Sequence, residues 1–270
     1  MIHRTIELGE GVTLKTYVQE PSGEKYETSF SGEKKPAVLI LPGGSYLYVS
    51  EREGEPVALR FLKEGIQAFV LSYRCGDESM YPNPIIDLLK AVEHLKGHAE
   101  YYDIDPDNIS LVGFSAGGHL AALYGGIYHQ EEVKALGFEP FKPKTLILAY
   151  PVLMIGGKSM ERFKDYDLKA MLGSFMNTFD VRTSPYKHLH PDYPDTFLFF
   201  IKDDELIDPT DSFAFVTKAL SLGVKIETHF FDEGVHGLST ADDLSCQDRE
   251  YPKRLGVWLD LAINWLKEKM

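Results

Sequence analysis

One segment of the sequence is the strongest indication of the fold: Ile109-Ser-Leu-Val-Gly-Phe-Ser-Ala-Gly-Gly-His-Leu-Ala-Ala-Leu-Tyr124. It starts with an apolar run that predicts a buried strand, and it ends with a run of small residues that predicts a helix. Between the two runs, Gly113-Phe-Ser-Ala-Gly117 matches the pattern G-x-S-x-G, which belongs at a sharp turn from a strand into a helix. A pattern with only three fixed positions can occur by chance, so the interpretation depends on its place between a predicted strand and a predicted helix.

The glycines of this pattern have a steric reason. A sharp turn strains the backbone at Ser115, and bulky side chains two positions before or after it would clash with the neighbouring strand and helix. The hydroxyl of Ser115 then stands clear of the sheet edge, and the helix N-terminus behind it offers an N–H group to a developing negative charge. We therefore predict that Ser115 is a nucleophile, against the alternative of a chance match in a glycine-rich loop.

Apolar runs alternate with helical patterns on both sides of this stretch. The alternation predicts an α/β fold with a mostly parallel central sheet of about eight strands, flanked by helices. We interpret residues 1–270 as one domain, with an insertion at about 152–193 that has no clear strand and forms a small helical cap. Strands are expected as a pair before Gln19 and at 37–41, 68–73, 109–113, 145–150, 196–201 and 225–231, helices at 57–63, after Pro84, at 116–124, at 213–222 and near the C-terminal end, and a turn at 105–108.

Composition and charge exclude several classes of protein. Of the 270 residues 44% are hydrophobic, and 28 Lys and Arg against 41 Asp and Glu give a net charge of −13. A chain this acidic repels phosphate groups, which argues against nucleic-acid binding and against docking on anionic membranes. Cys75 and Cys246 form no CxxC pair and are expected as free thiols. The sequence has neither a signal-peptide pattern nor a long apolar stretch, so we expect a cytoplasmic protein.

A second glycine-rich turn follows the predicted strand at 37–41. In Leu41-Pro-Gly-Gly-Ser-Tyr46, consecutive glycines let the backbone approach a ligand closely and direct N–H groups toward it. A simple tight turn would have the same composition. Its place ahead of Ser115 favours a role in binding an oxyanion, and we assign that role to the N–H groups of Gly44, Ser45 and Ala116.

A neutral serine needs a base to take its proton, and His236 is the best candidate. It lies in Asp232-Glu-Gly-Val-His-Gly237, directly after the last predicted strand. His188 and His190 in the insertion have a spacing that could chelate a metal, but the sequence offers no third ligand, and we expect no metal site. The other histidines fall on predicted helices or have no supporting context: His3, His94, His98, His119, His129 and His229.

The base needs an acidic partner that orients its ring. Asp203 and Asp204 both follow the predicted strand at 196–201, where such a carboxylate belongs, and Asp208 and Asp211 are reserve candidates. The order serine, aspartate, histidine along the chain is the order of α/β-hydrolases. Because acidic residues at strand ends are common, the pattern alone leaves the choice between Asp203 and Asp204 open.

Four blocks resemble one family, the acetyl esterase and acetyl xylan esterase group of the α/β-hydrolases, which is similar to the hormone-sensitive-lipase-like esterases. The resemblance implies Asp204 as the acid, because the family's aspartate is followed three residues later by Val or Ile, as here by Ile207. Two departures are Ser45, where the lipase-like esterases have a third glycine, and Asp208, where proline is usual. The blocks are Leu41–Tyr46, Asp105–Leu120, Ala149-Tyr-Pro-Val152 and Val235-His-Gly-Leu-Ser239.

The resemblance implies a serine esterase that needs no cofactor and cleaves short-chain, acetyl esters, with acetylated sugars as candidate substrates. We expect a substrate pocket near Tyr46, Phe114 and Phe175. The aromatic and methionine residues of the insertion offer the alternative of a pocket for a larger apolar group. A peptidase, thioesterase or lactonase on the same fold stays open, as does a catalytically silent binding protein. A small-molecule ester is the expected partner, and a homodimer is an expectation on which no residue pattern bears.

Overall fold

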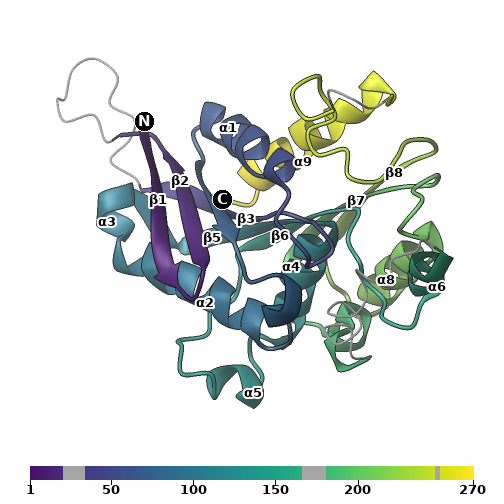
Figure 1. The fold of residues 1–270 in the computed structure, drawn as a ribbon, viewed down its shortest axis with the longest axis horizontal. Coiled ribbons are helices and arrows are strands. Elements are labelled where there is room, and N and C mark those ends of the chain that lie inside the picture. The colour runs from purple at the N-terminus through teal and green to yellow at the C-terminus, as the bar shows by residue number, and fades with distance from the viewer. Residues whose placement is uncertain (21–33, 166–180, 247–249) are drawn as a thin grey trace.

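The computed structural model of the protein, which describes residues 1–20, 34–165, 181–246 and 250–270, is built around one eight-stranded sheet (Figure 1). The strand order is β1-β2-β4-β3-β5-β6-β7-β8. The pairs β1–β2 and β2–β4 are antiparallel, whereas every other neighbouring pair is parallel. The mostly parallel sheet predicted from the sequence is therefore confirmed.

The inner strands are almost entirely apolar, because helices cover both faces of the sheet. Every residue of β6 is buried, and so are the last six residues of β7. The edge strand β1 instead consists of exposed and half-buried residues only. The strands are β1 (Ile2–Gly9), β2 (Val12–Val18), β3 (Lys35–Leu41), β4 (Gln67–Ser72), β5 (Ile104–Phe114), β6 (Thr145–Ala149), β7 (Asp195–Ile201) and β8 (Ile226–Phe231).

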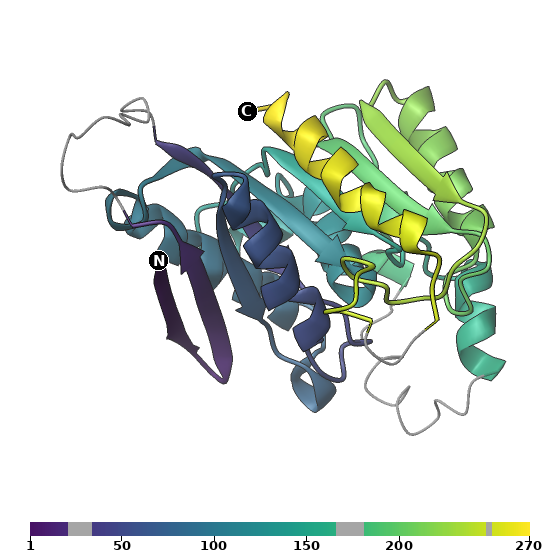
Figure 2. The same cartoon turned by 90° about the horizontal axis from the view of Figure 1, so that it is seen from above.

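Helices form a layer on each side of the sheet, as Figure 2 shows from above. Residues of α1 and α9 pack on one face, and residues of α2, α4 and α8 pack on the other. The helices are α1 (Glu55–Lys63), α2 (Asn83–Gly97), α3 (Ala99–Tyr102), α4 (Ser115–Ile127), α5 (Glu131–Lys134), α6 (Lys158–Asp165), α8 (Pro209–Ser221) and α9 (Val257–Lys267), and short 3-10 turns are η1 (Glu51–Glu53), η2 (Gly76–Glu78), η3 (Val181–Thr183), η4 (Pro185–His188) and η5 (Lys253–Gly256).

Aromatic rings fill the layer between the sheet and α9. The Trp258 ring lies 5.0 Å from that of Phe199 and 5.9 Å from that of Phe114, and all three side chains are fully buried. The apolar stripe predicted for the last helix thus faces the sheet. Removing a buried aromatic side chain of this size costs about 3–5 kcal/mol of folding free energy, so this layer fixes the position of the strand ends above it.

The turn predicted at 105–108 is instead the first part of β5. Lys35 pairs with Ile104, whereas Ala37, two residues later on β3, pairs with Ile109. The extra residues of β5 form an irregularity in the ladder. There the Asp107 N–H donates to the Asp105 side chain at 3.0 Å, which is the local hydrogen bond expected of an aspartate turn. The turn chemistry is present, but the strand continues through it.

The segment between β6 and β7 differs from the rest of the chain. Its described parts contain α6, η3 and η4 and no strand. No helix within the described ranges is long and apolar enough to cross a membrane.

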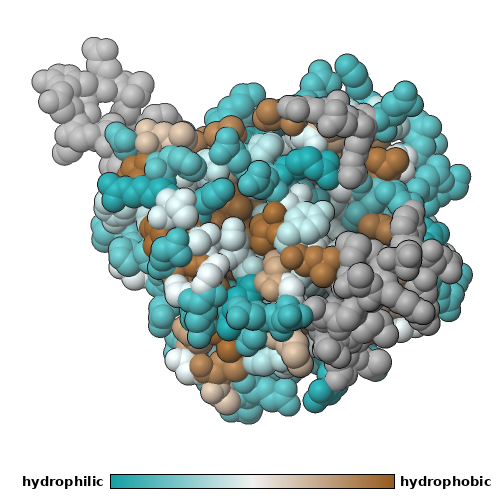
Figure 3. All heavy atoms as spheres, viewed as in Figure 1, coloured by the Kyte–Doolittle hydropathy of each residue, from teal (hydrophilic) through white to brown (hydrophobic). Residues whose placement is uncertain are grey.

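On the face drawn in Figure 3, apolar residues lie singly or in small groups among hydrophilic ones. Cys75 and Cys246 are unpaired, and burial raises the pKa of the Cys75 thiol to about 12.

Candidate active site

The predicted site residues lie where parallel strands end. Ser115 follows β5, Asp204 lies three residues after β7, and His236 lies five residues after β8. The Pro42-Gly43-Gly44 turn follows β3, the neighbour of β5 in the sheet. Because these strands run parallel, their carboxyl ends meet at one edge of the sheet, which is where open α/β sheets bind ligands.

The turn at Ser115 has no space for side chains on either glycine of the pattern. Ser115 itself has a φ of +49°, a strained value for a residue with a side chain. A Cβ atom added to Gly113 would lie 2.5 Å from the carbonyl oxygen of Gly117. One added to Gly117 would lie 2.0 Å from the carbonyl oxygen of Leu41. The two glycines therefore allow β3, β5 and α4 to meet around the serine.

Ser115, His236 and Asp204 form a continuous relay of hydrogen bonds. His236 Nε2 lies 2.8 Å from Ser115 Oγ, and His236 Nδ1 lies 2.8 Å from Asp204 Oδ2. The second oxygen of Asp204 accepts the N–H groups of Leu206 and Ile207, at 2.9 and 2.8 Å. All three relay side chains are buried. The carboxylate is thus held by backbone donors on one oxygen and orients the imidazole with the other.

The environment of His236 favours its protonated form. Burial would lower the pKa of the imidazole, but the charge of Asp204 and its hydrogen bond act in the opposite direction. The charges of Glu53 and Glu205 add to this effect, and the pKa lies above its ordinary value of 6.5. The nearby carboxylates stabilise the protonated imidazole, so the ring can take up a proton during a reaction.

The other candidate acids lie away from His236. The Asp203 side chain is 57% exposed and lies near Lys202. Asp208 caps α8 through the N–H of Thr210, and Asp211 accepts hydrogen bonds from the first residues of α6. Of the four acids, only Asp204 bonds to the imidazole.

Two further histidines have structural partners. His119, one turn after Ser115 on α4, bonds to the hydroxyl of Tyr46 and to the carbonyl of Thr183, and burial lowers its pKa to about 4. His188 contacts Gln130 and the carbonyl of Arg182. Within the described residues, no group of three or more His, Cys, Asp or Glu is arranged to hold a metal ion.

The turn after β3 has a left-handed backbone over three consecutive residues. The φ angles are +123° at Gly44, +57° at Ser45 and +59° at Tyr46. The N–H of Gly43 donates to Glu53 at 2.7 Å, whereas the N–H groups of Gly44 and Ser45 have no acceptor among the described residues. Successive N–H groups in such turns form concavities that bind anions.

The predicted substrate-pocket residues have other positions. Phe114 is fully buried and packs beneath the site against Trp258, so its expected place in the pocket is wrong. Tyr46 is 1% exposed and uses its hydroxyl to hold His119, so its side chain belongs to the core as well. Phe175 lies outside the described residues. Strand and turn residues next to a motif can face either side of a sheet, and proximity in sequence does not decide which.

Several contacts around the site have no signal in the sequence. Glu53 accepts hydrogen bonds from Gly43 and from the hydroxyl of Tyr150, and Glu205 accepts the backbone N–H of His236. From α6, Arg162 donates to the carbonyl of Asp204. Polar residues in loops are usually solvated, so the residue type alone does not indicate which of them are buried.

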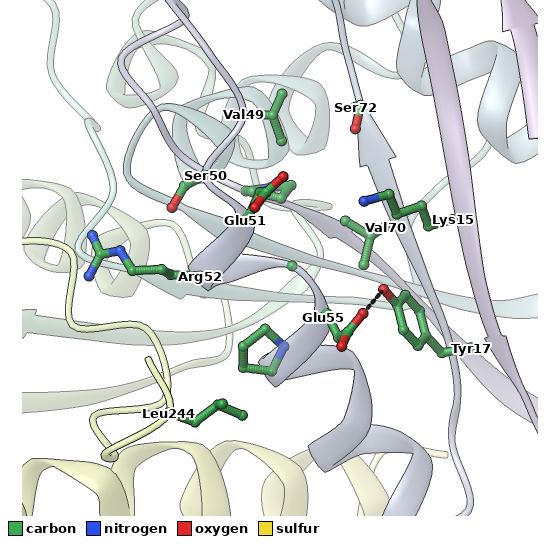
Figure 4. A pocket seen from close by; sticks show the side chains of 13 residues that line it. Lys15, Tyr17, Val49, Ser50, Glu51, Arg52, Glu55, Val70, Ser72 and Leu244 are labelled. Carbon is green, nitrogen blue, oxygen red and sulfur yellow. Dashed lines mark hydrogen bonds between the residues drawn. The ribbon is translucent and has the colours of Figure 1, made fainter. Parts of the chain in front are cut away.

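A pocket of about 400 Å³ lies behind the turn that follows β3, as Figure 4 shows. It is lined by Pro42, by residues 49–52, by parts of β2, β4 and the start of α1, and by Leu244, with Lys15 and Arg52 among its charged residues. At its wall the hydroxyl of Tyr17 donates to Glu55 at 3.0 Å. None of the three relay residues lines it. The relay and this pocket are therefore separate features of the structure.

Comparison with known proteins gives a consistent result. The family model described as BD-FAE matches residues 26–219. The endo-1,4-β-xylanase B of Butyrivibrio fibrisolvens is 28% identical over 221 residues, which are 78% of this chain and 33% of that protein. The acetylxylan esterase of Xylanibacter ruminicola is 23% identical over 231 residues, 83% of this chain and 45% of that protein. The chain thus spans less than half the length of these curated relatives.

Solved structures match over nearly the whole chain. A carboxylesterase from Lactobacillus plantarum has a TM-score of 0.85 at 27% identity, with 99% of this chain and 97% of that chain covered. An α/β hydrolase enzyme from a deep-sea metagenome library of the Medee basin has a TM-score of 0.79 at 30% identity, with 100% and 98% covered. Because the family model spans most of the chain and these folds agree, this chain belongs to the BD-FAE family of α/β-hydrolases.

Proposed function

We propose that the protein is a serine hydrolase of carboxylic esters, in which Ser115 is the nucleophile, His236 the general base and Asp204 its orienting acid. The observation that carries the proposal is the relay itself. Two contacts of 2.8 Å connect a strained serine at a helix N-terminus to a buried aspartate through one imidazole. This arrangement has the geometry that activates a serine hydroxyl.

The proposed reaction uses only side chains and backbone groups of the chain. His236 Nε2 accepts the proton of Ser115 as Oγ attacks the ester carbonyl, and the N–H groups of Gly44, Ser45 and Ala116 stabilise the oxyanion. The protonated His236 then donates to the leaving alcohol, which frees the alcohol and leaves an acyl group on the serine. Water attacks this acyl group by the same path, and the free acid leaves.

We further propose a short acyl group, acetyl in the first place, on a sugar or another small alcohol. Ser115 and His236 are each only 8% exposed, so the proposed reaction takes place at buried atoms, which favours a small group at the carbonyl carbon. Two relatives support this choice by name: one is an acetylxylan esterase, and a solved structure at 25% identity and a TM-score of 0.74 is an acetyl ester-xyloside bifunctional hydrolase from Caldicellulosiruptor lactoaceticus. A cytoplasmic location stays a prediction of the sequence, and a homodimer stays an expectation that no residue pattern supports.

Replacement of the nucleophile tests the activity. Ser115→Ala removes the attacking oxygen, so hydrolysis of p-nitrophenyl acetate should fall by about 10⁶-fold in kcat, as for other enzymes whose triad acts as a unit. Ser72→Ala is the matched control, because Ser72 is half-buried in β4 and lines the pocket behind the site. Turnover by Ser115→Ala at the rate of the control would end the proposal, and a fluorophosphonate probe should label only the variants that keep Ser115.

A series of p-nitrophenyl esters and acetylated sugars tests the acyl group. The rate should be highest for acetate and fall as the acyl chain lengthens, because a longer chain needs more space next to the buried Ser115. A maximum at long chains would contradict the acetyl assignment without affecting the assignment of the triad. Cleavage of peptide anilides in preference to esters would move the protein to the peptidases of the same fold.

A further inference from the structure

A buried carboxylate next to the site has no place in the reaction proposed above. Glu53 ends η1, ten residues after Gly43, and is only 3% exposed. Among the described residues no Lys or Arg pairs with it. Burying a carboxylate without a cation is costly unless hydrogen bonds compensate the lost hydration.

The two oxygens of Glu53 reach two different loops. Oε2 accepts the N–H of Gly43, in the turn after β3, at 2.7 Å. Oε1 accepts the hydroxyl of Tyr150, directly after β6, at 2.8 Å. Because the Tyr150 oxygen itself accepts the N–H of Ser239 at 2.8 Å, its proton points to Glu53. Both carboxyl oxygens are therefore acceptors, which is the pattern of the ionised form.

The same contacts reach the loop of the catalytic base. Ser239 lies three residues after His236, and its hydroxyl donates to the backbone carbonyl of Arg52. The Arg52 guanidinium in turn donates to the carbonyl of Ser245 at 3.1 Å, further along the same loop. The ring of Tyr150 lies 5.0 Å from the imidazole of His236 in an edge-on arrangement. The turn η1 thus connects the loop after β3 with the loop after β8.

From this geometry we propose that Glu53 is a positioning residue, which holds the N–H groups of the turn after β3 and the imidazole of His236 in register with each other. The inference rests on the proposed function. By occupying the Gly43 N–H, Glu53 sets the direction of the peptide groups that follow, at Gly44 and Ser45. Through Tyr150 and Ser239 it sets the position of the base. Neither contact touches the reacting atoms, so Glu53 acts through other residues.

The charge of Glu53 has a second effect on the base. The carboxylates that face His236 come from two elements, Asp204 and Glu205 from the loop after β7 and Glu53 from η1, while Tyr150 contributes a ring and a hydroxyl from the end of β6. Burial lowers the pKa of His236, and these three charges raise it. Removing the charge of Glu53 should therefore lower the pKa. Since the neutral imidazole is the base, the rise of activity with pH should move to lower pH.

A pair of glutamates provides the experiment. Glu53 faces inward to Tyr150, whereas Glu55, two residues later, is exposed, accepts the hydroxyl of Tyr17 and lines the pocket behind the site (Figure 4). Glu53→Gln and Glu55→Gln make the same chemical change on the two sides of one turn, and Glu53→Ala also removes both hydrogen bonds. The readouts are kcat and KM for p-nitrophenyl acetate from pH 5 to 9, and the titration of His236 followed by NMR.

We expect Glu53→Ala to lose about 10²-fold in kcat, the effect of misplacing catalytic groups by about 1 Å. KM should change much less, because the oxyanion donors act mainly in the transition state. Glu53→Gln should lose less in kcat, and both its activity profile and its His236 titration should move to lower pH. Glu55→Gln should match the wild type in all of these measurements.

Each result has one consequence. If Glu53→Gln and Glu53→Ala match Glu55→Gln in kcat and in the titration of His236, Glu53 is not a positioning residue. If Glu53→Ala does not fold, Glu53→Gln and its NMR titration still decide. If the wild type cleaves no ester, the proposed function fails, whereas the titration of His236 in Glu53→Gln still tests the contact between the two loops.

Discussion

The two ends of the parallel strands are built differently. At the carboxyl ends, residues with side chains adopt left-handed backbone angles at six described positions: Ser45, Tyr46, Ser115, Tyr150, Ser239 and Ala241. At the amino ends the corresponding residue is Asp103, just before β5, and aspartate adopts such angles at little cost. Backbone strain is therefore concentrated at the edge of the sheet that carries the candidate site.

The buried charged side chains of the candidate site follow the same division, although exposed charges such as Asp203 also occur at the carboxyl ends. At the carboxyl ends Glu53, Asp204 and His236 are 3%, 1% and 8% exposed. Glu53 accepts hydrogen bonds from uncharged groups, and Asp204 and His236 bond to each other. At the amino ends the ion pairs are partly exposed, as between Lys269 and Asp195 at the start of β7. Water stabilises the charges of the second group, whereas the fold itself must stabilise those of the first. Substitutions at the two ends should therefore have very different effects.

The largest difference is expected within one pair of neighbours at the end of β7. In Asp204→Asn, the N–H groups of Leu206 and Ile207 keep the amide oxygen on their side, so the amide NH₂ faces His236 Nδ1. The imidazole then carries its proton on Nε2 and cannot accept the proton of Ser115. We expect kcat to fall by about 10⁴-fold.

Asp203→Asn is the control for this prediction, because its side chain is mostly exposed and has no contact with His236. Steady-state kinetics with p-nitrophenyl acetate should give wild-type values for it. A loss in Asp203→Asn comparable to that in Asp204→Asn would show that the acid has been assigned to the wrong residue.

An intermediate difference is expected between two glycines. A Cβ at position 117 would lie 2.0 Å from the backbone oxygen of Leu41, so Gly117→Ala forces β3 and α4 apart and should cost about 3 kcal/mol of unfolding free energy. Gly97→Ala, at the last residue of α2, meets no atom within 4 Å and should be neutral or stabilise the helix slightly.

Urea denaturation with a common m-value measures both variants. Equal stability of Gly117→Ala and Gly97→Ala would mean that the carboxyl edge can relax around an added methyl group. The close packing at the nucleophile turn would then not be a constraint on the sequence.

The smallest effect is expected at the amino ends. Asp195 and Lys269 lie 3.0 Å apart and are 29% and 30% exposed, and pairs with this exposure contribute at most about 1 kcal/mol. Asp195→Asn should lower the unfolding free energy within that limit and leave kcat and KM unchanged. A clear loss of activity in this variant would contradict the separation of the two ends.

The sequence predicts those parts of the molecule that depend on local chemistry. Strands covered on both faces have continuous apolar runs, as in Thr145–Ala149. The turn at Ser115 has space only for glycine on either side of it, and this requirement is visible in the sequence as the pattern G-x-S-x-G. The residue Glu53 could not be found in this way, because Ser50-Glu-Arg-Glu-Gly54 has the composition of a solvated turn. Its partner Tyr150 is 97 residues away, and only the folded chain brings them together.

Two predictions failed because each was made from a few neighbouring residues alone. Phe114 and Ser115 are adjacent, yet the strand directs the phenyl ring into the core while the turn lifts the hydroxyl to the sheet edge. The turn predicted at 105–108 has the expected aspartate hydrogen bond, but pairing with β3 extends the strand through it. In both cases the tertiary environment outweighs the local pattern.

The helix α6 has a consequence for redesign of substrate preference. Arg162 of α6 holds the backbone carbonyl of Asp204 and pairs with Asp208 at 2.8 Å, and Asp211 accepts the first N–H groups of the same helix. Anyone who exchanges the segment between β6 and β7 for that of a relative therefore also exchanges a support of Asp204, the proposed catalytic acid. A graft that keeps Lys158–Arg162 should keep this support of Asp204, whereas one that omits them should also slow the proposed reaction.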